Sequence, residues 1–477
     1  MTLAGNSAFD IAVVGGGFAG LTAGLRSAER GAKVLILEQG EDERYPCNSR
    51  YSGGVFHIAY GDPSRSAEEL VAAINAMTKG EAEADIAGAV AAHSARTLEW
   101  LRAQGAKFIK GPLDWQRFLT APPRPLKAGL DWPGYGPDVL LRNLTAKFRE
   151  KGGTLALGYR AVALTLEGDR CTGLTARGRE GGEVEIAAGA VILADGGFQG
   201  NADMVQAHIA PRPDLLIQRS AGTGRGDGIR MAQAAGAQLS DMSRFYGHLL
   251  SRDGLENDDL WPYPQMDQVA AAAIVIDGSG NRFTDEGLGG IWLANRIAAF
   301  EDPTTSFTVF DRTIWEDGPG TKSIYPANPT VEKAGGAVFR ADSPEALARL
   351  IGVDGAALTR TIKAYNTAVR AGAGSSLTPQ RSDGTPPATP IETPPFMAIP
   401  LAVGITATMG GVLVDAEMAV RGKGGDPIAG LYAAGGTTGG LEGGGNLGYV
   451  GGLSKAVTMG MIAAETATDV VLREVTG

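Results

Sequence analysis

Short apolar runs separated by a glycine-rich turn dominate the start of the chain. Residues 11–14 form an uninterrupted apolar run that leads directly into the segment 15–20, GGGFAG. A stretch with helical character, 21–30, comes next, and a second apolar run, 33–37, ends at Glu38. Short continuous apolar runs are typical of strands that are buried on both faces. The pattern therefore predicts a strand, a helix and a second, parallel strand.

The far end of the chain has a comparable pattern. Residues 430–436, GLYAAGG, form an apolar run that ends in a glycine turn, and a glycine-rich stretch, 443–456, contains a single tyrosine, Tyr449. From Gly452 onward the small and apolar residues have helical spacing. We therefore predict a strand, a ligand-approaching turn and a long helix, because glycines let a backbone come close to a bound group.

The middle of the chain contains a different kind of segment. Residues 343–365 contain two capped helical stretches, whereas 371–396 has six prolines and reads as an extended connection. A chain of 477 residues is also longer than one ordinary core requires. We therefore expect two or three domains, with the extended segment returning the chain from one to another.

The composition restricts the classes of partner. The chain has a net charge of −10 and a pI near 5.1, which argues against nucleic acid, because phosphate backbones require a basic surface. Its two cysteines, Cys47 and Cys171, argue against a disulfide framework or a thiolate site, and we predict no metal. Without a basic segment before the first apolar run or an apolar span of membrane length, a cytoplasmic protein is expected.

The first strand–helix–strand unit has the spacing of a dinucleotide site. Gly15 forms the turn, Gly17 permits approach to a pyrophosphate, and Gly20 permits close packing of helix on strand. Glu38, at the end of the second strand, is placed to accept a hydrogen bond from a ribose hydroxyl. The free N–H groups at the start of the helix favour the anionic pyrophosphate.

Further motifs lie in order along nearly the whole chain: 48–54 (NSRYSGG), 194–198 (ADGGF), 222–236 (GTGRGDGIRMAQAAG), 280–286 (GNRFTDE), 408–411 (TMGG) and 430–436. Together with the dinucleotide motif, they resemble the FAD flavoproteins of the succinate dehydrogenase and fumarate reductase type. The nearest likeness is to tricarballylate dehydrogenase-like and ketosteroid dehydrogenase-like members.

The resemblance implies an α/β fold, with a Rossmann-like FAD-binding domain formed by 1–240 and 385–477 and an inserted α+β capping domain, 241–384. It also implies tightly bound FAD. Attachment is expected to be non-covalent, because no histidine lies between Cys47 and Gly54, and Cys47 has no sign of a thiolate. The implied cofactor-binding residues are Gly15, Gly17, Ala19, Gly20, Glu38, Gln39, Asn48, Ser49, Ser52, Gly53, Gly54, Val162, Ala194, Gly196, Gly197, Asp227, Gly435, Gly436, Gly452, Leu453 and Ser454.

The chain departs from the fumarate reductases at their substrate-binding positions. Their proton-donating arginine corresponds to Gly290, and the next arginine is Arg296. Thr406 and Ala407 stand in place of their histidine pair. Their dicarboxylate-binding arginine corresponds to Asn446 or Tyr449, depending on the alignment.

These departures favour an FAD-dependent dehydrogenase that oxidises a Cα–Cβ bond next to a carboxylate or ketone, by α-proton abstraction and hydride transfer to flavin N5. The alternative is a fumarate reductase-like reduction of an α,β-unsaturated acid, in which Arg296 or a tyrosine supplies the proton. A third alternative is a non-catalytic flavin-binding or electron-transfer module. No haem or iron–sulfur motif is present, so we expect oxygen, a quinone or a partner protein to accept the electrons.

Four residues are candidates for catalysis, each with a structural alternative. Tyr449 is the predicted donor to a carbonyl oxygen, or its hydroxyl caps the glycine turn. His248 matches a substrate-contacting histidine of the family, or it is a hydrogen-bonded histidine between domains. Tyr325 is a candidate base or an ordinary loop tyrosine. Arg50 is predicted to hold a substrate carboxylate, or to pair with Glu442 or the cofactor.

Two more arginines, Arg117 and Arg124, lie in a proline-rich loop. They are candidates for lining the entrance to the site. A solvated loop is the favoured interpretation for both of them.

Overall fold

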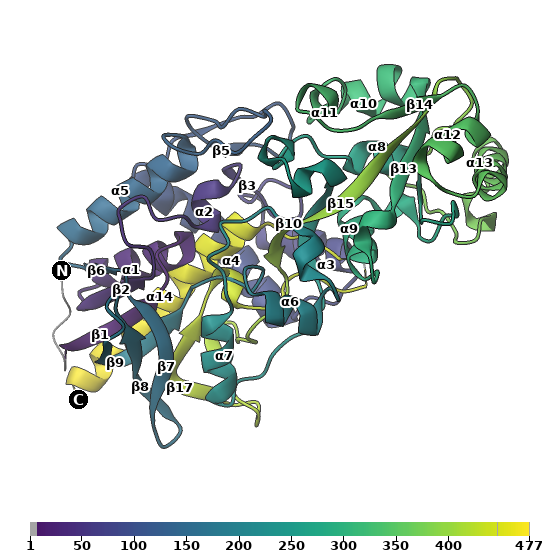
Figure 1. The fold of residues 1–477 in the computed structure, drawn as a ribbon. Helices are drawn as coiled ribbons and strands as arrows, with labels where there is room; N and C mark the ends of the chain where they lie inside the picture. Colours follow the sequence, from purple (N-terminus) through teal and green to yellow (C-terminus); the bar gives the residue numbers. More distant parts are fainter. Residues whose placement is uncertain (1–6, 446, 477) are drawn as a thin grey trace.

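The computed structural model describes residues 7–445 and 447–476 and contains two lobes (Figure 1). The larger lobe is built on an eight-stranded sheet with the order β16-β17-β8-β9-β1-β2-β6, in which β7 pairs with β8. Its strands are β1 (Ser7–Val14), β2 (Val34–Glu38), β6 (Thr154–Leu157), β7 (Arg160–Glu167), β8 (Arg170–Arg177), β9 (Glu183–Leu193), β16 (Ala419–Arg421) and β17 (Pro427–Ala433).

The centre of this sheet is parallel, as the apolar pattern predicts. Val13 of β1 lies opposite Ile36 of β2 on one side and opposite Ile192 of β9 on the other. All three side chains are fully buried, because helices cover both faces of the sheet. The covering helices include α1 (Phe18–Glu29), α5 (Gly136–Glu150) and α14 (Gly452–Thr476).

Glycines allow these helices to pack closely. A Cβ atom at Gly20 would lie 1.9 Å from the carbonyl oxygen of Gly15, and one at Gly460 would lie 2.5 Å from the carbonyl oxygen of Ala19. Helix α14 therefore packs directly against α1, at the C-terminal edge of the central strands. This contact brings the two glycine-rich ends of the sequence together, as expected.

The smaller lobe, called the cap below, contains most of a second, six-stranded sheet (Figure 1). Its central strand, β15, is thirteen residues long and runs from the cap into the larger lobe. The strands are β10 (Leu216–Gln218), β11 (Phe245–Ser251), β12 (Ile274–Ile276), β13 (Phe307–Asp311), β14 (Phe339–Ala341) and β15 (Phe396–Thr408). The helices of the cap are α8 (Asp267–Ala272), α9 (Gly290–Ala298), α10 (Pro319–Lys322), α11 (Thr330–Lys333), α12 (Pro344–Ile351) and α13 (Gly355–Arg370).

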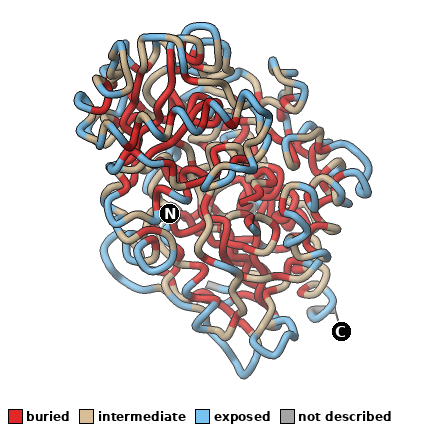
Figure 2. The backbone as a smooth tube through the Cα atoms, turned by 90° about the vertical axis from the view of Figure 1, so that its right-hand side faces the viewer, coloured by how far each residue is buried: buried red, intermediate tan, exposed pale blue. Residues whose placement is uncertain are grey.

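The remaining elements surround the larger lobe. A small antiparallel sheet consists of β3 (Val55–Phe56), β5 (Phe118–Thr120) and β4 (Phe108–Ile109). The other helices are α2 (Asn48–Tyr51), α3 (Ala67–Thr78), α4 (Ala84–Ala103), α6 (Ala202–His208) and α7 (Asp227–Ala234). Figure 2 shows buried segments inside both lobes and exposed segments mainly in the connections.

The structure confirms the α/β fold class and the predicted helices between 343 and 365, which are α12 and α13. The proline-rich segment is extended as predicted: within 371–395 the one helical element is the short 3₁₀ turn Gly374–Ser376. The predicted domain boundaries stay predictions. Two strands that lie outside 241–384, β10 and β15, contribute to the sheet of the cap.

Candidate active site

A cavity of about 330 Å³ runs from the glycine-rich turn after β1 to the base of the cap. Its walls come from segments that are distant in sequence, including the turn after β1, the α2 region, β11, the end of β15 and the start of α14. Most of the predicted cofactor-binding residues line it: Gly15, Gly17, Ala19, Glu38, Gln39, Asn48, Ser49, Ser52, Gly53, Gly54, Ala194, Gly196, Gly197, Asp227, Gly436, Gly452 and Leu453.

Four of the predicted cofactor-binding residues lie outside the cavity lining. Gly20 packs on Gly15, and a Cβ atom at Gly435 would lie 2.9 Å from that of Ala19, so both serve close packing. Val162 lines an adjoining second hollow, together with Asp227. Ser454 is 2% exposed, and its hydroxyl has no hydrogen-bond partner among the described residues.

The dinucleotide end of the cavity has the donors and acceptors that FAD requires. The two carboxylate oxygens of Glu38 accept from the N–H groups of Gly16 and Gly40, each at 2.8 Å, which orients the side chain and leaves further acceptor capacity for a ribose hydroxyl. The hydroxyl of Ser49 accepts from the N–H of Phe18 at 2.9 Å, in the first turn of α1. The first turn of this helix faces the cavity and favours the pyrophosphate.

Asp195, also in the cavity wall, adds a carboxyl group that accepts from the N–H of Gly228 at 2.8 Å. Burial raises the pKa of Asp195 to about 6. Burial also raises the pKa of the Cys47 thiol to about 12, which leaves it protonated and a poor nucleophile. A protonated Cys47 is consistent with the prediction that FAD is attached non-covalently, which stays a prediction.

Three side chains form a hydrogen-bonded chain at the cap end of the cavity. His248 Nε2 lies 2.9 Å from the hydroxyl of Tyr246, and His248 Nδ1 contacts a carboxylate oxygen of Asp267. The other oxygen of Asp267 accepts from the N–H of Leu249 at 2.7 Å. Burial and the positive charge of Arg219 lower the pKa of His248, although Asp267 opposes them, so the imidazole is neutral at pH 7.

The sequence identified only His248 of this chain. Tyr246 was within reach of sequence reasoning, because residues two apart on a strand point to the same face. Asp267 was not, because it comes from α8 and meets β11 only through the tertiary fold.

Tyr449 lies directly against Tyr246 of this hydrogen-bonded chain. Its ring stacks on that of Tyr246, with a centroid distance of 3.8 Å and an interplanar angle of 12°. Its hydroxyl oxygen accepts from the N–H of Gly452 at 2.9 Å, as in the turn-capping alternative, but the O–H proton stays free to be donated. Burial raises the pKa of Tyr449 well above its ordinary value, so the proton is retained at pH 7. Donation and capping are therefore compatible.

Tyr325 also lines the cavity, where its ring stacks on that of Tyr263 at 4.5 Å. Burial raises the pKa of Tyr325 strongly. Among the described residues, no histidine or carboxylate contacts this hydroxyl, so Tyr325 lacks the acceptor that a phenolic base needs.

Arg50 does not have the predicted role. Its side chain is 1% exposed, lies outside the cavity lining and pairs with Asp138 of α5, with Nε 3.0 Å from Oδ1. The carbonyl groups of Tyr45 and Glu43 accept from its other nitrogens. Both sequence interpretations are therefore wrong, because the partner is a residue that only the fold brings near.

Two arginines of the cavity were overlooked or undervalued. Arg219, which no motif marks, donates to Thr406 Oγ1 at 2.6 Å and to the Pro262 carbonyl at 3.2 Å. Arg124 also lines the cavity and donates to the Tyr51 carbonyl, so it is not a solvated loop residue. Neither arginine pairs with a carboxylate of the described residues. Arg117, by contrast, is exposed and pairs with Asp62.

The structure shows the surroundings of two of the positions that distinguish the chain from the fumarate reductases. A Cβ atom at Gly290 would lie 2.1 Å from Cγ of Asp267, so no arginine fits there beside this carboxylate. Arg296 is exposed on α9 and does not line the cavity, which removes it as the acid of the alternative reaction. Asn446 lies outside the described residues.

No group of three or more His, Cys, Asp or Glu side chains within the described residues is arranged to hold a metal ion. Within 7–445 and 447–476, no helix is long and apolar enough to cross a membrane.

Comparison with known proteins gives the same picture as the cavity. A vinyl phenol reductase of Lactiplantibacillus plantarum is 28% identical, over 93% of this chain and 92% of its own. A fumarate reductase (cytochrome) of Shewanella frigidimarina is 27% identical over 96% and 76%, and a 4-oxocyclohexanecarboxylate 2-dehydrogenase of Sinomonas cyclohexanicum is 27% identical over 96% and 93%.

Among solved structures, a 3-ketosteroid Δ1-dehydrogenase from Sterolibacterium denitrificans has the same fold, with a TM-score of 0.73 and 21% identity over 98% of this chain and all of its own. A family model described as an FAD binding domain matches residues 10–450. The chain therefore belongs to this FAD-binding family, and it is an FAD-dependent oxidoreductase.

Proposed function

We propose that the protein is a dehydrogenase that oxidises a Cα–Cβ single bond next to a carboxylate or ketone. The observation that carries the proposal is the hydrogen-bonded chain that runs from Tyr246 through His248, which both line the cavity, to Asp267, which lies outside the lining. Such a reaction needs a base for the α-proton and a donor to the activating carbonyl oxygen. The hydrogen-bonded chain provides the base, and Tyr449 provides the donor.

Tyr246 is the proposed base, and His248 makes this role feasible. Burial raises the pKa of Tyr246 well above its ordinary value, so the phenol must lose its own proton as it takes the α-proton. The neutral His248 accepts that proton at Nε2, and the carboxylate of Asp267 stabilises the resulting imidazolium at Nδ1. Bound FAD supplies the acceptor for the β-hydride. The electron pair of the broken Cα–H bond becomes the new double bond as the β-hydride leaves.

Tyr449 is proposed to polarise the substrate carbonyl. Because the N–H of Gly452 fixes the phenol oxygen, the O–H bond has a defined direction before the substrate arrives. Preorganised donors stabilise the negative charge that develops on a carbonyl oxygen when an α-proton leaves. The stacked rings hold donor and base side by side.

Aromatic side chains make the cap end of the cavity suitable for a ring-bearing substrate. These side chains are Tyr51, Tyr60, Trp115, Tyr246, Tyr263, Tyr325 and Tyr449. Flat walls of this kind favour cyclic ligands, which can stack on them. The names of two relatives, a vinyl phenol reductase and a 4-oxocyclohexanecarboxylate dehydrogenase, also refer to cyclic compounds.

The second candidate is reduction of an α,β-unsaturated acid, which the name of the fumarate reductase relative favours. In that direction the same chain runs in reverse, and the O–H of Tyr246 delivers the proton to Cα. The absence of an arginine at Gly290 is the reason to rank this candidate second, because the family's proton donor is then missing.

The proposal is tested by mixing the oxidised flavoprotein anaerobically with saturated cyclic acids and ketones and following flavin bleaching. The wild type should bleach, and Tyr246→Phe should slow bleaching by about 10³-fold, because a positioned base contributes about 10²–10⁴-fold. Tyr449→Phe should slow it by about 10²-fold. Asp267→Asn should shift the acid limb of the pH profile, since the imidazolium loses its stabilising carboxylate.

Tyr432→Phe is the matched control, because Tyr432 is a buried tyrosine in β17 outside the cavity lining. Failure of every saturated compound, combined with reoxidation of the dithionite-reduced protein by an unsaturated acid, would establish the reductase instead. An unchanged rate in Tyr246→Phe would reject the proposed base.

A further inference from the structure

The backbone of the second sheet carries Arg219 to the catalytic chain. Arg219 follows directly after β10, which pairs with β15, and β11 pairs with the other side of β15. Gly404 of β15 lies opposite His248 of β11. A Cβ atom at Gly404 would lie 2.4 Å from Cδ of Arg219, so the arginine side chain passes over this glycine towards β11. Arg219 and His248 therefore face the same end of the cavity.

The charge of Arg219 is incompletely compensated within the protein. A hydroxyl and a backbone carbonyl accept from its two Nη groups, and its Nε is buried with no hydrogen-bond partner among the described residues. A partly buried arginine without an anionic partner is unfavourable, and burial lowers the pKa of Arg219 for that reason. Of the other two arginines that line the cavity, Arg160 pairs with Asp227, and Arg124 adds to the positive charge.

The carboxylates of the cavity are engaged elsewhere. Glu38, Asp195 and Asp227 lie at the dinucleotide end, and Glu442 accepts from Val450 N–H and Gly451 N–H and pairs with Lys455. Asp267, which lies outside the lining, contacts His248. The cap end of the cavity therefore has excess positive charge. An anionic ligand is the natural complement of this charge.

We infer that Arg219 binds the carboxylate group of the substrate, and that the cavity selects ring-bearing monocarboxylic acids over neutral ring compounds. This inference rests on the proposed function, because it names the substrate class of the same site. The aromatic walls contact the ring, and Arg219 holds the charged end beside Tyr246 and His248. A neutral steroid-like ketone would leave this arginine without a partner.

Binding of the carboxylate also affects the base. The positive charge of Arg219 contributes to the lowered pKa of His248. A bound carboxylate neutralises that charge, so His248 becomes a better proton acceptor only when an acid occupies the site. The acid limb of flavin reduction should therefore lie at a higher pH for the bound complex than for the free protein.

The test uses the oxidised holoprotein and two matched probes, 3-phenylpropanoate and 3-phenylpropanamide, titrated against the flavin absorbance spectrum. The acid should bind about 10²-fold more tightly than the amide, given what a charged hydrogen-bonding partner contributes. Arg219→Met should remove this preference without weakening amide binding, and Arg219→Lys should retain part of it. Arg117→Gln, an exposed arginine of a neighbouring loop, should change neither affinity.

Equal binding of acid and amide by the wild type overturns the inference, and this comparison needs no variant. Loss of flavin from Arg219→Met also overturns it, because the arginine would then serve the cofactor. Bleaching by saturated neutral ketones with no preference for acids leaves the dehydrogenase standing and rejects the carboxylate site. Tight acid binding without bleaching by any saturated acid supports the carboxylate site and rejects the dehydrogenase.

Discussion

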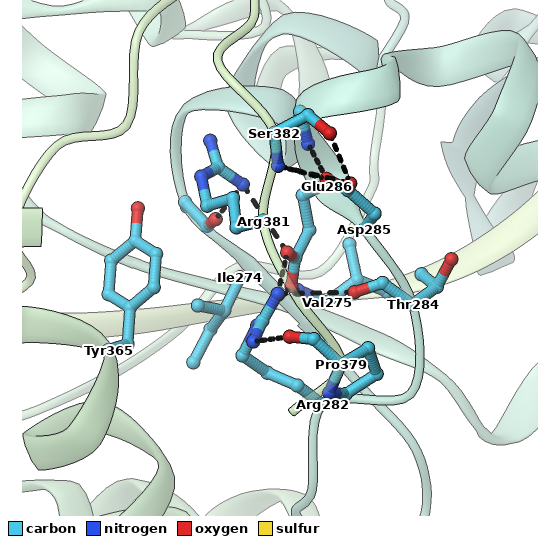
Figure 3. A network of polar contacts seen from close by, with 12 residues as sticks. Ile274, Val275, Arg282, Thr284, Asp285, Glu286, Tyr365, Pro379, Arg381 and Ser382 are labelled. Atoms are coloured by element: carbon cyan, nitrogen blue, oxygen red, sulfur yellow. Dashed lines mark hydrogen bonds and ion pairs between the residues drawn. The ribbon is translucent and has the colours of Figure 1, made fainter. Parts of the chain in front are cut away.

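Two buried arginines of the cap, Arg282 and Arg381, differ from Arg219 of the cavity in what compensates their charge. In the cap, the fully buried carboxylate of Glu286 accepts from Arg282 Nε at 2.9 Å and lies 3.3 Å from Arg381 Nη1 (Figure 3). Backbone carbonyls also accept from the Nη groups of both arginines, whereas Arg381 Nε has no hydrogen-bond partner among the described residues. In the cavity, Arg219 donates to one hydroxyl and one carbonyl, and it pairs with no carboxylate of the described residues.

This difference separates structure from recognition. Arg381 belongs to the proline-rich segment, so its pairing with Glu286 attaches that segment to the cap, and neighbouring Ser382 donates to Asp285 in the same way (Figure 3). The GNRFTDE motif therefore contributes a structural clamp. An arginine whose partner the chain does not supply, such as Arg219, is instead available to an anionic ligand.

Replacement of the shared carboxylate should have the largest effect on stability. Glu286→Gln leaves two buried arginines without their anion and should lower the free energy of unfolding by about 3–5 kcal/mol. Chemical denaturation of the FAD-saturated protein measures the loss. Glu332→Gln, which breaks the half-exposed pair with Arg340, is the matched control and should cost less than about 1 kcal/mol. Equal losses in the two variants would contradict the clamp.

Arg50 offers a second test, because the sequence places it in the site and the structure places it in the core. Arg50→Met leaves Asp138 buried with only the more exposed Arg142 as a cationic partner, and should cost about 3 kcal/mol. The affinity of the folded protein for 3-phenylpropanoate should not change. A variant of normal stability that binds the acid weakly would restore the original prediction.

His57 extends the comparison to a titratable group that is buried without a charged partner. Burial lowers its pKa to about 4, whereas the pKa of a histidine in the unfolded chain is about 6.5. Between these two pH values the unfolded state therefore binds more protons than the folded state. Stability should therefore fall with decreasing pH, by about 1.6 kcal/mol between pH 6.5 and pH 5. His57→Asn keeps an acceptor for the N–H of Tyr60 and should remove this contribution. Parallel pH dependence in both proteins would show that His57 does not titrate as expected.

The smallest effect is expected for the stability of Arg219→Met. Removal of an uncompensated, partly buried charge offsets the two lost hydrogen bonds, so the free energy of unfolding should change by less than about 1 kcal/mol. Thermal unfolding of the ligand-free holoprotein provides the measurement. A loss as large as that of Glu286→Gln would place Arg219 among the structural arginines.

The sequence predicted the cofactor end of the site better than the substrate end. The glycine turn, Glu38 and the helix at Gly452 are local patterns with fixed spacing, and they line the cavity apart from the packing glycines. The substrate end combines Tyr246 of β11, Asp267 of α8 and Arg219, which follows β10. No local spacing relates these three residues, so the sequence predicted only His248 and the tyrosines Tyr449 and Tyr325 at this end of the cavity.

Sequence alone determined the class of fold, the cofactor and the order of the flavin motifs, because strand, turn and helix signals act over a few residues. Only the tertiary structure decided which arginine has a protein partner. Asp138 lies 88 positions from Arg50 in the sequence, whereas Arg219 is brought to His248 by the pairing of β10 and β11 with β15. Charge compensation depends on distances of a few ångströms between remote segments, and the fold sets those distances.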